Sequence, residues 1–422
     1  MRILIVNTSE RTGGAAVAAG RLMEALNKNG IKAKMLVRDK QTDALTVASV
    51  GGGWRAQLPF LWERLCIYVR MHFSRKHLFD VDIANAGFDI TRLPEFQEAD
   101  VVHLHWINQG FLSLRSIRKI LKSGKTVVWT LHDMWPAMGI CHHPRDCRNY
   151  VDGCGNCFFL PNGGQKNDLS AAIWEKKQRI WGQGNISFVA CSKWLADKVS
   201  DSGLLKGSFL TNIPNPIDTR IYCSQSKEKA RESLSLPTGK QLLLFASRSI
   251  ADPRKGIHLF IEAVKLLVER LPEAREHVGI VMLGGHAEDF EGQFPLPMYP
   301  LGYVSDERMI VNVYNSVDVF VTPSLDENLP NTIMEAMACG VPCVGFRTGG
   351  IPEMIDHRVN GYVADYQSAD DLAAGMQWVL SETSREELSQ AAVGKVHRCY
   401  SQSAVAKRYE DVYRRALSER YK

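Results

Sequence analysis

The sequence predicts an α/β protein with two similar domains, each built on a parallel β-sheet that helices cover on both faces. Short apolar runs alternate with amphipathic helical stretches, and the runs lack the apolar–polar alternation of a half-exposed strand. The pattern restarts after the proline-rich segment 214–216. At 422 residues the chain is also too long for one ordinary hydrophobic core, which favours two domains.

The first half contains five apolar runs of strand length. They are Ile3–Val6, Ala33–Val37, Val101–Leu104, Val127–Leu131 and Ser187–Ala190. A turn at Gly13 and Gly14 follows the first run, and the stretch from Ala15 to Lys28 has the pattern of a helix. Strands separated by helices indicate a Rossmann-like domain, which we expect to cover residues 1–213.

The second half repeats this alternation. Its strand-like runs are Leu242–Ala246, Gly279–Leu283, Val317–Thr322 and Pro342–Gly345, and Ile257–Arg270 has the pattern of a helix. We expect a second Rossmann-like domain over residues 217–396. A last helical stretch, 397–422, is predicted to pack back on the first domain.

Composition limits the functional classes. The chain is 45% hydrophobic and 23% charged, with a net charge of +5 and no long Lys/Arg run, so nucleic acid is not an expected partner. The N-terminal apolar run stops after four residues, and no run approaches the roughly 18 apolar residues of a membrane-spanning helix. We therefore expect a cytoplasmic protein whose ten cysteines are reduced or bind metal.

Two glutamates mark a candidate ligand site in the second half. Glu327 lies in the loop after the strand 317–322, and Glu335 lies just over one turn into the helix that runs from residue 330 or 331 to about Ala338. Open α/β sheets bind ligands at the carboxyl ends of their strands, and a helix N-terminus suits a phosphate. Two carboxylates on either side of it would bind sugar or ribose hydroxyls. The alternative is an ordinary loop charge and a solvated helix residue.

The residues around these glutamates resemble a known signature. Glu327 and Glu335 are separated by seven residues, E-A-M-A-C-G-V-P starts at Glu335, and G-G-I-P-E runs from Gly349 to Glu353. This pattern resembles the retaining GT-B glycosyltransferases of family 4 (glycosyl transferases group 1), including bacterial exopolysaccharide, capsule and lipopolysaccharide enzymes. The resemblance implies two Rossmann-like domains facing across a cleft. It also implies sugar transfer, with retention of configuration, from a UDP- or GDP-sugar to a carbohydrate or lipid-linked glycan.

The resemblance assigns roles to the loop between the two glutamates. Glu327 would contact the donor sugar as a catalytic residue, and Glu335 would hold the ribose hydroxyls. The family commonly has Gly-Phe-Gly after the first glutamate, whereas this chain has Asn328-Leu329-Pro330. Because Pro330 has no N–H, the amides of Asn331 and Thr332 are expected to bind the donor phosphates in its place. Asn328 and Leu329 are also expected to line the donor site.

Three further residues are assigned to the donor. Arg248 and Lys255 bracket the loop that follows the strand 242–246, where two cations would neutralise a diphosphate leaving group. In the resembled family, an Arg and a Lys at these places do so. Arg254 is expected to be a solvated loop cation, and Tyr303 corresponds to the region where the family holds the nucleobase.

The first domain is expected to contribute the acceptor side. By resemblance, the Gly13–Gly14 turn lies over the donor phosphates, and His132 is a catalytic residue that touches the donor sugar. Asp133 is expected to orient His132 or to face the acceptor. His103 and His105 alternate on one strand and are expected to form pocket wall or core. We place His105 on the acceptor side.

The segment Trp54–His77 has two open interpretations. It carries five Lys/Arg against one Glu, interleaved with aromatic residues. This composition fits a helix lying on an anionic membrane, which would put the protein on the inner face of the cell membrane. It fits equally an amphipathic helix packed on its own domain with the basic residues outward.

A cysteine cluster interrupts the first domain at about residues 141–157. Cys154 and Cys157 form a C-x-x-C pair, and Cys141 and Cys147 complete a set suited to structural zinc. Replacement of one thiolate by His142 or His143 is an alternative. Two disulfides are the alternative, although a cytosolic location disfavours them.

No cofactor is expected for catalysis, since no D-x-D motif stands out in a suitable loop. Two other functions remain open. One is a nucleotide-sugar epimerase on the same fold. The other is a catalytically silent, nucleotide-sugar-binding partner of a synthase.

Overall fold

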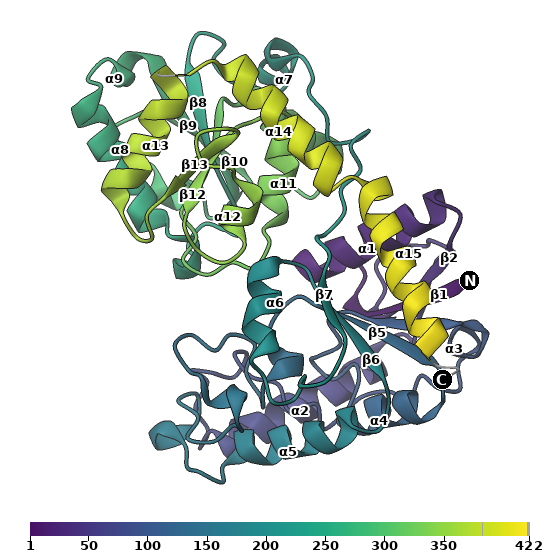
Figure 1. Ribbon diagram of the computed structural model, residues 1–422. Helices are drawn as coiled ribbons and strands as arrows, with labels where there is room; N and C mark the ends of the chain where they lie inside the picture. Colours follow the sequence, from purple (N-terminus) through teal and green to yellow (C-terminus); the bar gives the residue numbers. More distant parts are fainter. Residues whose placement is uncertain (382, 420–422) are drawn as a thin grey trace. The chain divides into compact units, whose positions relative to one another are not determined.

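The computed structural model describes residues 1–381 and 383–419, which form two compact units (Figure 1). The first unit comprises Met1–Pro216 together with the described residues from Val405 onward, and the second comprises Ile217–Ala404. Each unit contains one parallel β-sheet with its own helices. The predicted fold class, two parallel-sheet α/β domains, is confirmed.

The sheet of the first unit has seven strands in the order β3-β2-β1-β4-β5-β6-β7. The strands are β1 (Arg2–Ser9), β2 (Lys32–Asp39), β3 (Val47–Ser49), β4 (Val101–Leu104), β5 (Thr126–Leu131), β6 (Ile186–Ala190) and β7 (Leu210–Asn212). Ile3 of β1 is in register with Ala33 of β2 on one side and with Val101 of β4 on the other. The chain therefore reverses its direction of travel across the sheet between β1 and β4, the position where open α/β sheets bind ligands.

Helices cover both faces of this sheet. They are α1 (Gly14–Lys28), α2 (Leu58–Arg70), α3 (Pro94–Glu98), α4 (Leu114–Lys122), α5 (Leu169–Trp181), α6 (Lys193–Ser200) and α15 (Gln402–Glu419), with short 3-10 turns η1 (Trp54–Gln57), η2 (Trp135–Ala137), η3 (Asn149–Val151) and η4 (Pro161–Gly163). Successive residues of β1 alternate between the two cores. Ile3 and Ile5 pack with α1 and α15, whereas Leu4 and Val6 belong to the core that α2 to α6 cover.

The sheet of the second unit has six strands in the order β10-β9-β8-β11-β12-β13. The strands are β8 (Gln241–Ser249), β9 (Val278–Gly285), β10 (Met298–Gly302), β11 (Val319–Thr322), β12 (Cys343–Phe346) and β13 (Gly361–Ala364). The helices are α7 (Lys227–Ser233), α8 (Ile257–Arg270), α9 (Ala274–His277), α10 (Glu307–Ser316), α11 (Asn331–Ala338), α12 (Ile351–Met354), α13 (Ala369–Ser381) and α14 (Arg385–Cys399), with turns η5 (Pro253–Lys255) and η6 (Glu288–Phe290). Here the direction reverses between β8 and β11.

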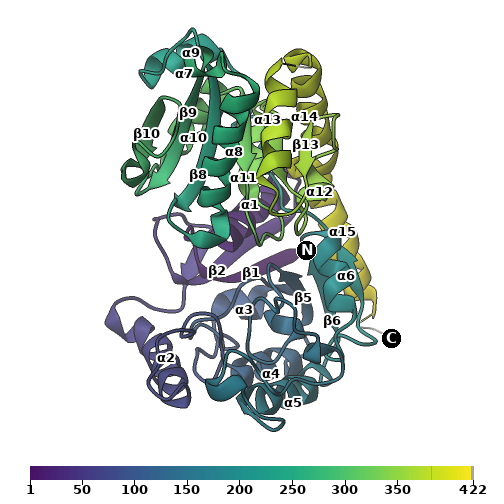
Figure 2. The same ribbon diagram turned by 90° about the vertical axis from the view of Figure 1, so that its left-hand side faces the viewer.

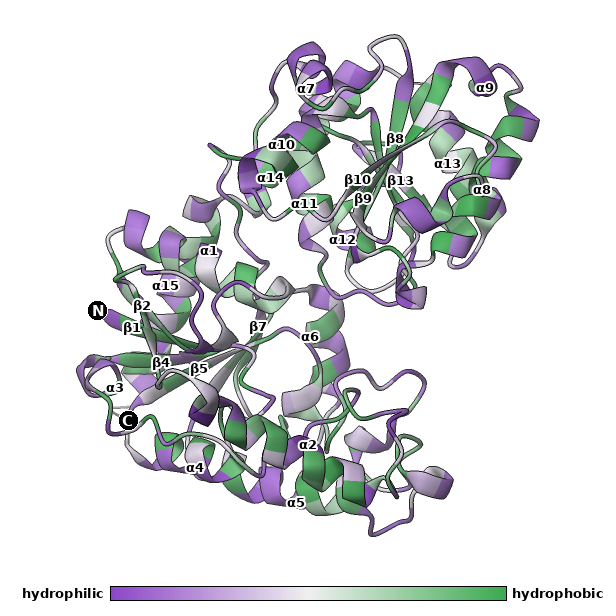
Figure 3. Cartoon of the chain, turned by 180° about the vertical axis from the view of Figure 1, so that it is seen from behind, coloured by the Kyte–Doolittle hydropathy of each residue, from purple (hydrophilic) through white to green (hydrophobic). Residues whose placement is uncertain are grey.

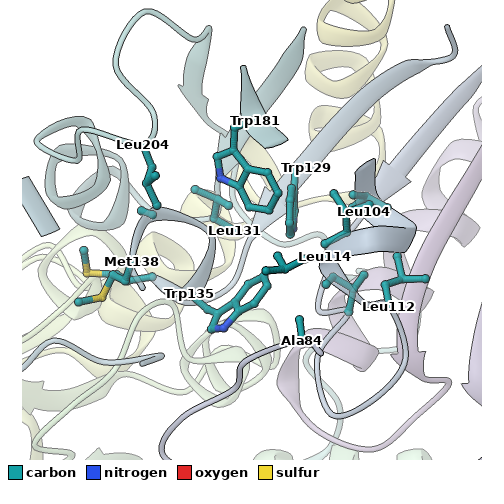
Figure 4. Close-up of a cluster of buried hydrophobic side chains, with 14 of the residues drawn as sticks. Ala84, Leu104, Leu112, Leu114, Trp129, Leu131, Trp135, Met138, Trp181 and Leu204 are labelled. Carbon is teal, nitrogen blue, oxygen red and sulfur yellow. The ribbon is translucent and has the colours of Figure 1, made fainter. Parts of the chain in front are cut away.

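The cores of both units are apolar, and their largest side chains are buried. In the second unit, α8 and α13 pack on one face of strands that are predominantly hydrophobic (Figure 3). In the first unit, Trp129, Trp135 and Trp181 lie together (Figure 4). Their indole N–H groups donate to the carbonyls of His105, Asp82 and Pro136, at 3.0, 2.8 and 3.0 Å, so the buried donors are satisfied.

The C-terminal helix α15 belongs to the first unit. The hydroxyl of Tyr409 lies 2.9 Å from that of Thr130, and the hydroxyl of Tyr413 lies 2.8 Å from Nδ1 of His103. The predicted helical stretch 397–422 divides differently in the structure. Residues 397–399 end α14, α15 begins at Gln402, and residues 420–422 lie outside the described part of the chain.

Four strands were not expected from the sequence, namely β3, β7, β10 and β13. All four lie at sheet edges. Three of them, β3, β7 and β10, are only partly buried, so they do not carry the continuous apolar runs that identify the central strands. β13 has only four residues, although all four are buried. Within the described ranges, no helix combines the length and the apolar character that crossing a bilayer requires.

Candidate functional site

The first unit contains a cavity of about 490 Å³ at the carboxyl ends of β1, β2, β4 and β5. It is lined by Asn7, Thr8, Ser9, Thr12, Gly13, Gly14, Ala15, Ala16, Asp39, Gln41, Trp106, Gln109, His132, Asp133 and His143. The cavity sits beside the reversal between β1 and β4. It therefore occupies the position at which the topology predicts a ligand.

Hydrogen bonds between strand ends shape the floor of the cavity. Asn7 accepts a bond from the backbone N–H of Trp106 at 3.0 Å, and the hydroxyl of Thr8 lies 2.9 Å from the carbonyl of Asn108. Gly13 has φ +94°, a conformation that favours glycine, and it leads directly into α1. The predicted Gly13–Gly14 turn thus lines the cavity.

His132 lies in the cavity wall and is backed by His105. Nδ1 of His105 lies 2.9 Å from Nε2 of His132, and the two rings stack at 5.2 Å. His105 is buried and is not among the lining residues, so it supports His132 instead of facing an acceptor. Burial lowers the pKa of His132 to about 4, although the Asp133 carboxylate acts in the opposite direction. His132 is therefore neutral near pH 7.

His103 lies deeper and belongs to the core. Its ring nitrogens contact Tyr413 and Thr130, each at 2.8 Å. Burial, aided by His132, lowers the pKa of His103 to about 3. Three neutral histidines therefore run from the core to the cavity wall, because His105 is also held well below its ordinary pKa by burial.

A buried chain of charges leads from the cavity wall to α2. Asp133 accepts from Nδ1 of His142 at 2.7 Å, and Asp82 lies 2.6 Å from Nε2 of the same ring. Asp82 also binds Arg64, whose guanidinium lies 3.7 Å from the Glu63 carboxylate. All five side chains are nearly inaccessible to solvent. Buried charges are tolerated only when they are paired in this way.

The pKa shifts follow from this pairing. Burial alone would lower the pKa of His142, but Asp133 and Asp82 outweigh it and raise the pKa to about 10. Burial would raise the pKa of Asp133, but the charge of His142 and its hydrogen bond hold it well below its usual range. Burial and the charge of Asp82 raise the pKa of Glu63 to about 7, against the effect of Arg64. At neutral pH, His142 is therefore a cation between two carboxylates.

Asp133 is fixed from several sides. Besides His142, its Oδ2 accepts from the indole of Trp106 at 2.9 Å, and its Oδ1 accepts from the backbone N–H of Trp135 at 2.9 Å. The carboxylate is thus a pre-oriented negative charge at the cavity wall, beside neutral His132.

The second unit brings Lys255 and Glu327 together. Lys255 ends η5 before α8, Glu327 follows β11, and their side chains form an ion pair at the carboxyl edge of the sheet. The Glu327 side chain is 15% exposed and that of Lys255 31%, so the pair is reachable from solvent. The structure therefore joins two residues that the sequence places 72 positions apart.

Two glycines make this close approach of loops possible. Gly256 has φ +70°, and a Cβ placed on it would lie 2.0 Å from the carbonyl oxygen of Pro323. Gly349 has φ +55°, and its Cβ would lie 1.5 Å from the carbonyl oxygen of Glu327. Any side chain at either position would displace the loop that carries Glu327. The first glycine of the G-G-I-P-E motif, Gly349, thus has a direct steric role.

Glu335 lies on the buried side of α11. Its Oε2 accepts from the hydroxyl of Tyr314, on α10, at 3.0 Å. Asn331 and Thr332 form the first turn of α11, as predicted, after Pro330. The backbone carbonyl of Asn328 accepts from the backbone N–H of Gly350 at 2.7 Å, and Leu329 is buried.

The remaining predicted donor residues are exposed. Arg248 lies near the end of β8 and Tyr303 follows β10. Tyr303 is 64% exposed. Arg254 forms a 2.8 Å ion pair with Asp252 and is largely solvated, as the sequence predicts.

The cysteine cluster contains free thiols. Cys141 and Cys157 are buried, and Cys147 and Cys154 are half-buried. Among the described residues, no three His, Cys, Asp or Glu side chains are arranged to hold a metal ion. Structural zinc stays a prediction. The ring nitrogens of His142 lie 2.7 Å from Asp133 and 2.6 Å from Asp82, so they contact carboxylates and not the cysteines.

Several cavity residues were missed from the sequence, including Asn7, Ser9, Asp39 and Trp106. All four lie at or just after the carboxyl end of a strand. Their position at strand ends indicates a ligand site, since the same position identifies His132 and Asp133 as candidates in the sequence.

Two family models match the chain, one to each half. Residues 12–221 match the model described as Glycosyltransferase Family 4, and residues 240–382 match Glycosyl transferases group 1. An uncharacterized glycosyltransferase of Methanocaldococcus jannaschii is 28% identical over 358 residues, which cover 80% of this chain and 90% of that protein. The chain is a GT-B glycosyltransferase.

Other relatives of the glycosyltransferase agree with this assignment. A D-inositol 3-phosphate glycosyltransferase of Saccharomonospora viridis is 29% identical over 215 residues, 48% of this chain and 49% of that protein. The chain therefore matches only about half of the length of that relative. Among solved structures, Anabaena HepE in complex with UDP superposes with a TM-score of 0.63 at 15% identity, covering 98% of this chain and 99% of HepE. This likeness concerns the fold.

Proposed function

We propose that the glycosyltransferase moves a sugar from a nucleoside diphosphate sugar, a UDP- or GDP-sugar, to a carbohydrate or lipid-linked glycan. The observation that carries this proposal is the solvent-accessible pair of Lys255 and Glu327 at the carboxyl edge of the second sheet. The UDP complex of the structural relative HepE supports a nucleotide donor. The inositol phosphate glycosyltransferases among the relatives support a hydroxyl acceptor.

The donor is assigned to the second unit. Glu335 binds the ribose hydroxyls, with Tyr314 holding its carboxylate in position. The backbone amides of Asn331 and Thr332, at the positive end of α11, bind the diphosphate. Tyr303 lies beside the nucleobase.

Electrostatic stabilisation of the leaving group lowers the activation barrier of the reaction. As the bond from the anomeric carbon to the diphosphate breaks, Arg248 and Lys255 neutralise the charge that grows on the departing oxygen. Glu327 positions Lys255 and contacts the sugar. The acceptor oxygen attacks from the same face, its bond to the anomeric carbon forms, and its proton passes to the diphosphate. Attack from that face retains the configuration.

The cavity of the first unit takes the acceptor. Asp133 is a fixed hydrogen-bond acceptor for a sugar hydroxyl, and neutral His132 is a hydrogen-bond partner of the transferred sugar. We place this activity in the cytoplasm, in the assembly of cell-surface polysaccharide. The reaction as proposed uses no divalent cation.

Incubation of the purified chain with labelled UDP-glucose, UDP-N-acetylglucosamine or GDP-mannose tests the proposal. D-inositol 3-phosphate and a bacterial membrane lipid extract serve as acceptors. We expect one donor to release its nucleoside diphosphate and to label an acceptor, and we expect Glu327→Ala to lose this activity.

Two outcomes would contradict the proposal. Label that appears in an altered nucleotide sugar without any acceptor would identify an epimerase. Full pathway function in the Glu327→Ala variant, without turnover in vitro, would identify a silent binding partner.

A further inference from the structure

Exposed hydrophobic side chains are concentrated in one segment of the first unit. Among the described residues, half of the large hydrophobic side chains that are exposed lie between positions 54 and 79. They are Trp54, Leu58, Leu61, Trp62, Leu65, Val69, Phe73 and Phe79. We call this set the apolar face. Contiguous exposed apolar surface of this kind marks a site of interaction.

The apolar face follows one side of α2. Its α2 members, at positions 58, 61, 62, 65 and 69, recur at the spacing of a single helical stripe. The opposite side of α2 carries Glu63, Arg64 and Ile67, all of which are buried. The helix thus turns its apolar stripe outward and part of its charge inward, which is the reverse of an ordinary surface helix. Figure 2 shows α2 at the periphery of the first unit.

The inward side of α2 is held firmly, so the stripe cannot rotate into the core. Glu63 accepts from the backbone N–H groups of Ile83 and Ala84 at 2.9 and 2.6 Å, and Arg64 binds Asp82. At the start of the helix, a Cβ on Gly110 would lie 2.3 Å from the backbone nitrogen of Phe60. The outward orientation is therefore built into the fold.

A groove of about 590 Å³ runs beside the stripe. It is lined by Leu58, Pro59, Leu61, Trp62, Leu65, Ala86 and Gly87. These residues offer apolar surface and backbone, a lining that suits hydrocarbon.

The segment that carries the apolar face also carries exposed positive charge. Its exposed cations are Arg55, Arg70, Arg75 and Lys76. The one exposed acidic residue between positions 54 and 80 is Asp80, which lies 2.7 Å from the His77 ring. The exposed side chains of this segment are therefore mostly apolar or cationic.

We propose that the apolar face docks on the surface of an anionic lipid bilayer, with its leucines and tryptophans among the acyl chains and its cations on the headgroup phosphates. A second copy of the chain fits less well. A twofold contact would place the four cations of each copy, eight like charges in all, at one interface. The inference goes beyond the proposed transfer reaction and does not depend on it.

Flotation of the full chain with lipid vesicles tests the proposal. We expect binding to vesicles of phosphatidylcholine and phosphatidylglycerol, and weak binding to phosphatidylcholine alone. The triple variant Leu61→Gln, Trp62→Gln, Leu65→Gln should lower the partition coefficient by at least about 10-fold, because it removes three apolar side chains that the bilayer would bury. Each of Arg70→Glu and Lys76→Glu should lower it about fivefold or more.

Matched controls distinguish a loss of membrane docking from a folding defect and from non-specific binding to lipid. Leu45→Gln removes a leucine that is 98% exposed outside the apolar face, and Lys206→Glu reverses an exposed cation elsewhere on the same unit. Both should bind as wild type does, and every variant should melt like wild type, since the replaced side chains are exposed. Equal binding by the triple variant and wild type would overturn the proposal. So would a wild-type dimer that only the triple variant converts to monomer, because the face would then join two copies.

Discussion

Lys255→Ala should lower kcat for sugar transfer by about 10²–10³-fold, the usual cost of removing one group that stabilises charge in a transition state. Lys255 is the cation that Glu327 holds at the sheet edge. Its loop is fixed on both sides, by Gly256 against Pro323 and by a 2.8 Å bond from the N–H of Leu325 to the carbonyl of Arg254. Because the charge is pre-positioned, little reorganisation accompanies the growth of negative charge on the leaving group.

Arg254→Ala is the matched control for this variant. It removes a cation from the adjacent position, but one that is solvated and paired with Asp252. We expect its kcat to stay within about threefold of wild type. Rates are measured with saturating donor, and the melting temperature of each variant is compared with that of wild type. Equal losses of kcat in both variants would contradict a specific role of Lys255, because any positive charge in the loop would then contribute equally.

His142→Ala should destabilise the first unit by about 3–5 kcal/mol. The substitution removes the cation between Asp82 and Asp133 and leaves two buried carboxylates facing each other. His142→Gln should lose less, because an amide fills the space and donates to one carboxylate. Urea denaturation of the three proteins measures the difference. His143→Ala, on the neighbouring residue at the cavity, is the control and should change stability much less.

The difference in free energy of unfolding between wild type and His142→Ala should depend on pH. The folded state raises the pKa of His142 to about 10, whereas an imidazole in the unfolded chain titrates near 6.5. The folded protein therefore keeps a proton that the unfolded chain releases. The contribution of His142 is complete below about pH 6.5 and is lost as the pH rises toward 10. A stability difference between the two proteins that stays constant from pH 6.5 to 10 would contradict a charged His142 between Asp133 and Asp82.

Local signals determined how much of the fold could be predicted. The helix after Glu327 was expected to run from residue 330 or 331 to about Ala338, and α11 is Asn331–Ala338. Pro330 before it and Gly340 after it set those limits in the sequence itself. The four edge strands had no such signal. β10, for example, contains Pro300 and is only partly buried.

The buried chain of charges from Asp133 to Glu63 could not be predicted, because its members are distant in the sequence and share no periodicity. Asp82 and His142 are 60 positions apart, and each looks like an isolated polar residue. The cysteines around His142 in the sequence indicate a metal ligand instead. The orientation of α2 was also undetermined, since composition alone allows its apolar side to face either the core or the solvent. Contacts of Glu63 and Arg64 with the core decide it.

A thermal-shift panel with UDP, GDP and ADP on wild type, Glu335→Ala and Glu262→Ala tests the central claim most directly. Glu262 is an exposed glutamate of α8 in the same unit, and each variant is compared with its own unliganded melting temperature. We expect one nucleotide to stabilise wild type and Glu262→Ala, by about 2.7 kcal/mol at 100 times its Kd. The same nucleotide should leave Glu335→Ala unchanged. Equal shifts in Glu335→Ala and wild type, or no shift with any nucleotide, would contradict a donor site built on Glu335 and the Lys255–Glu327 pair.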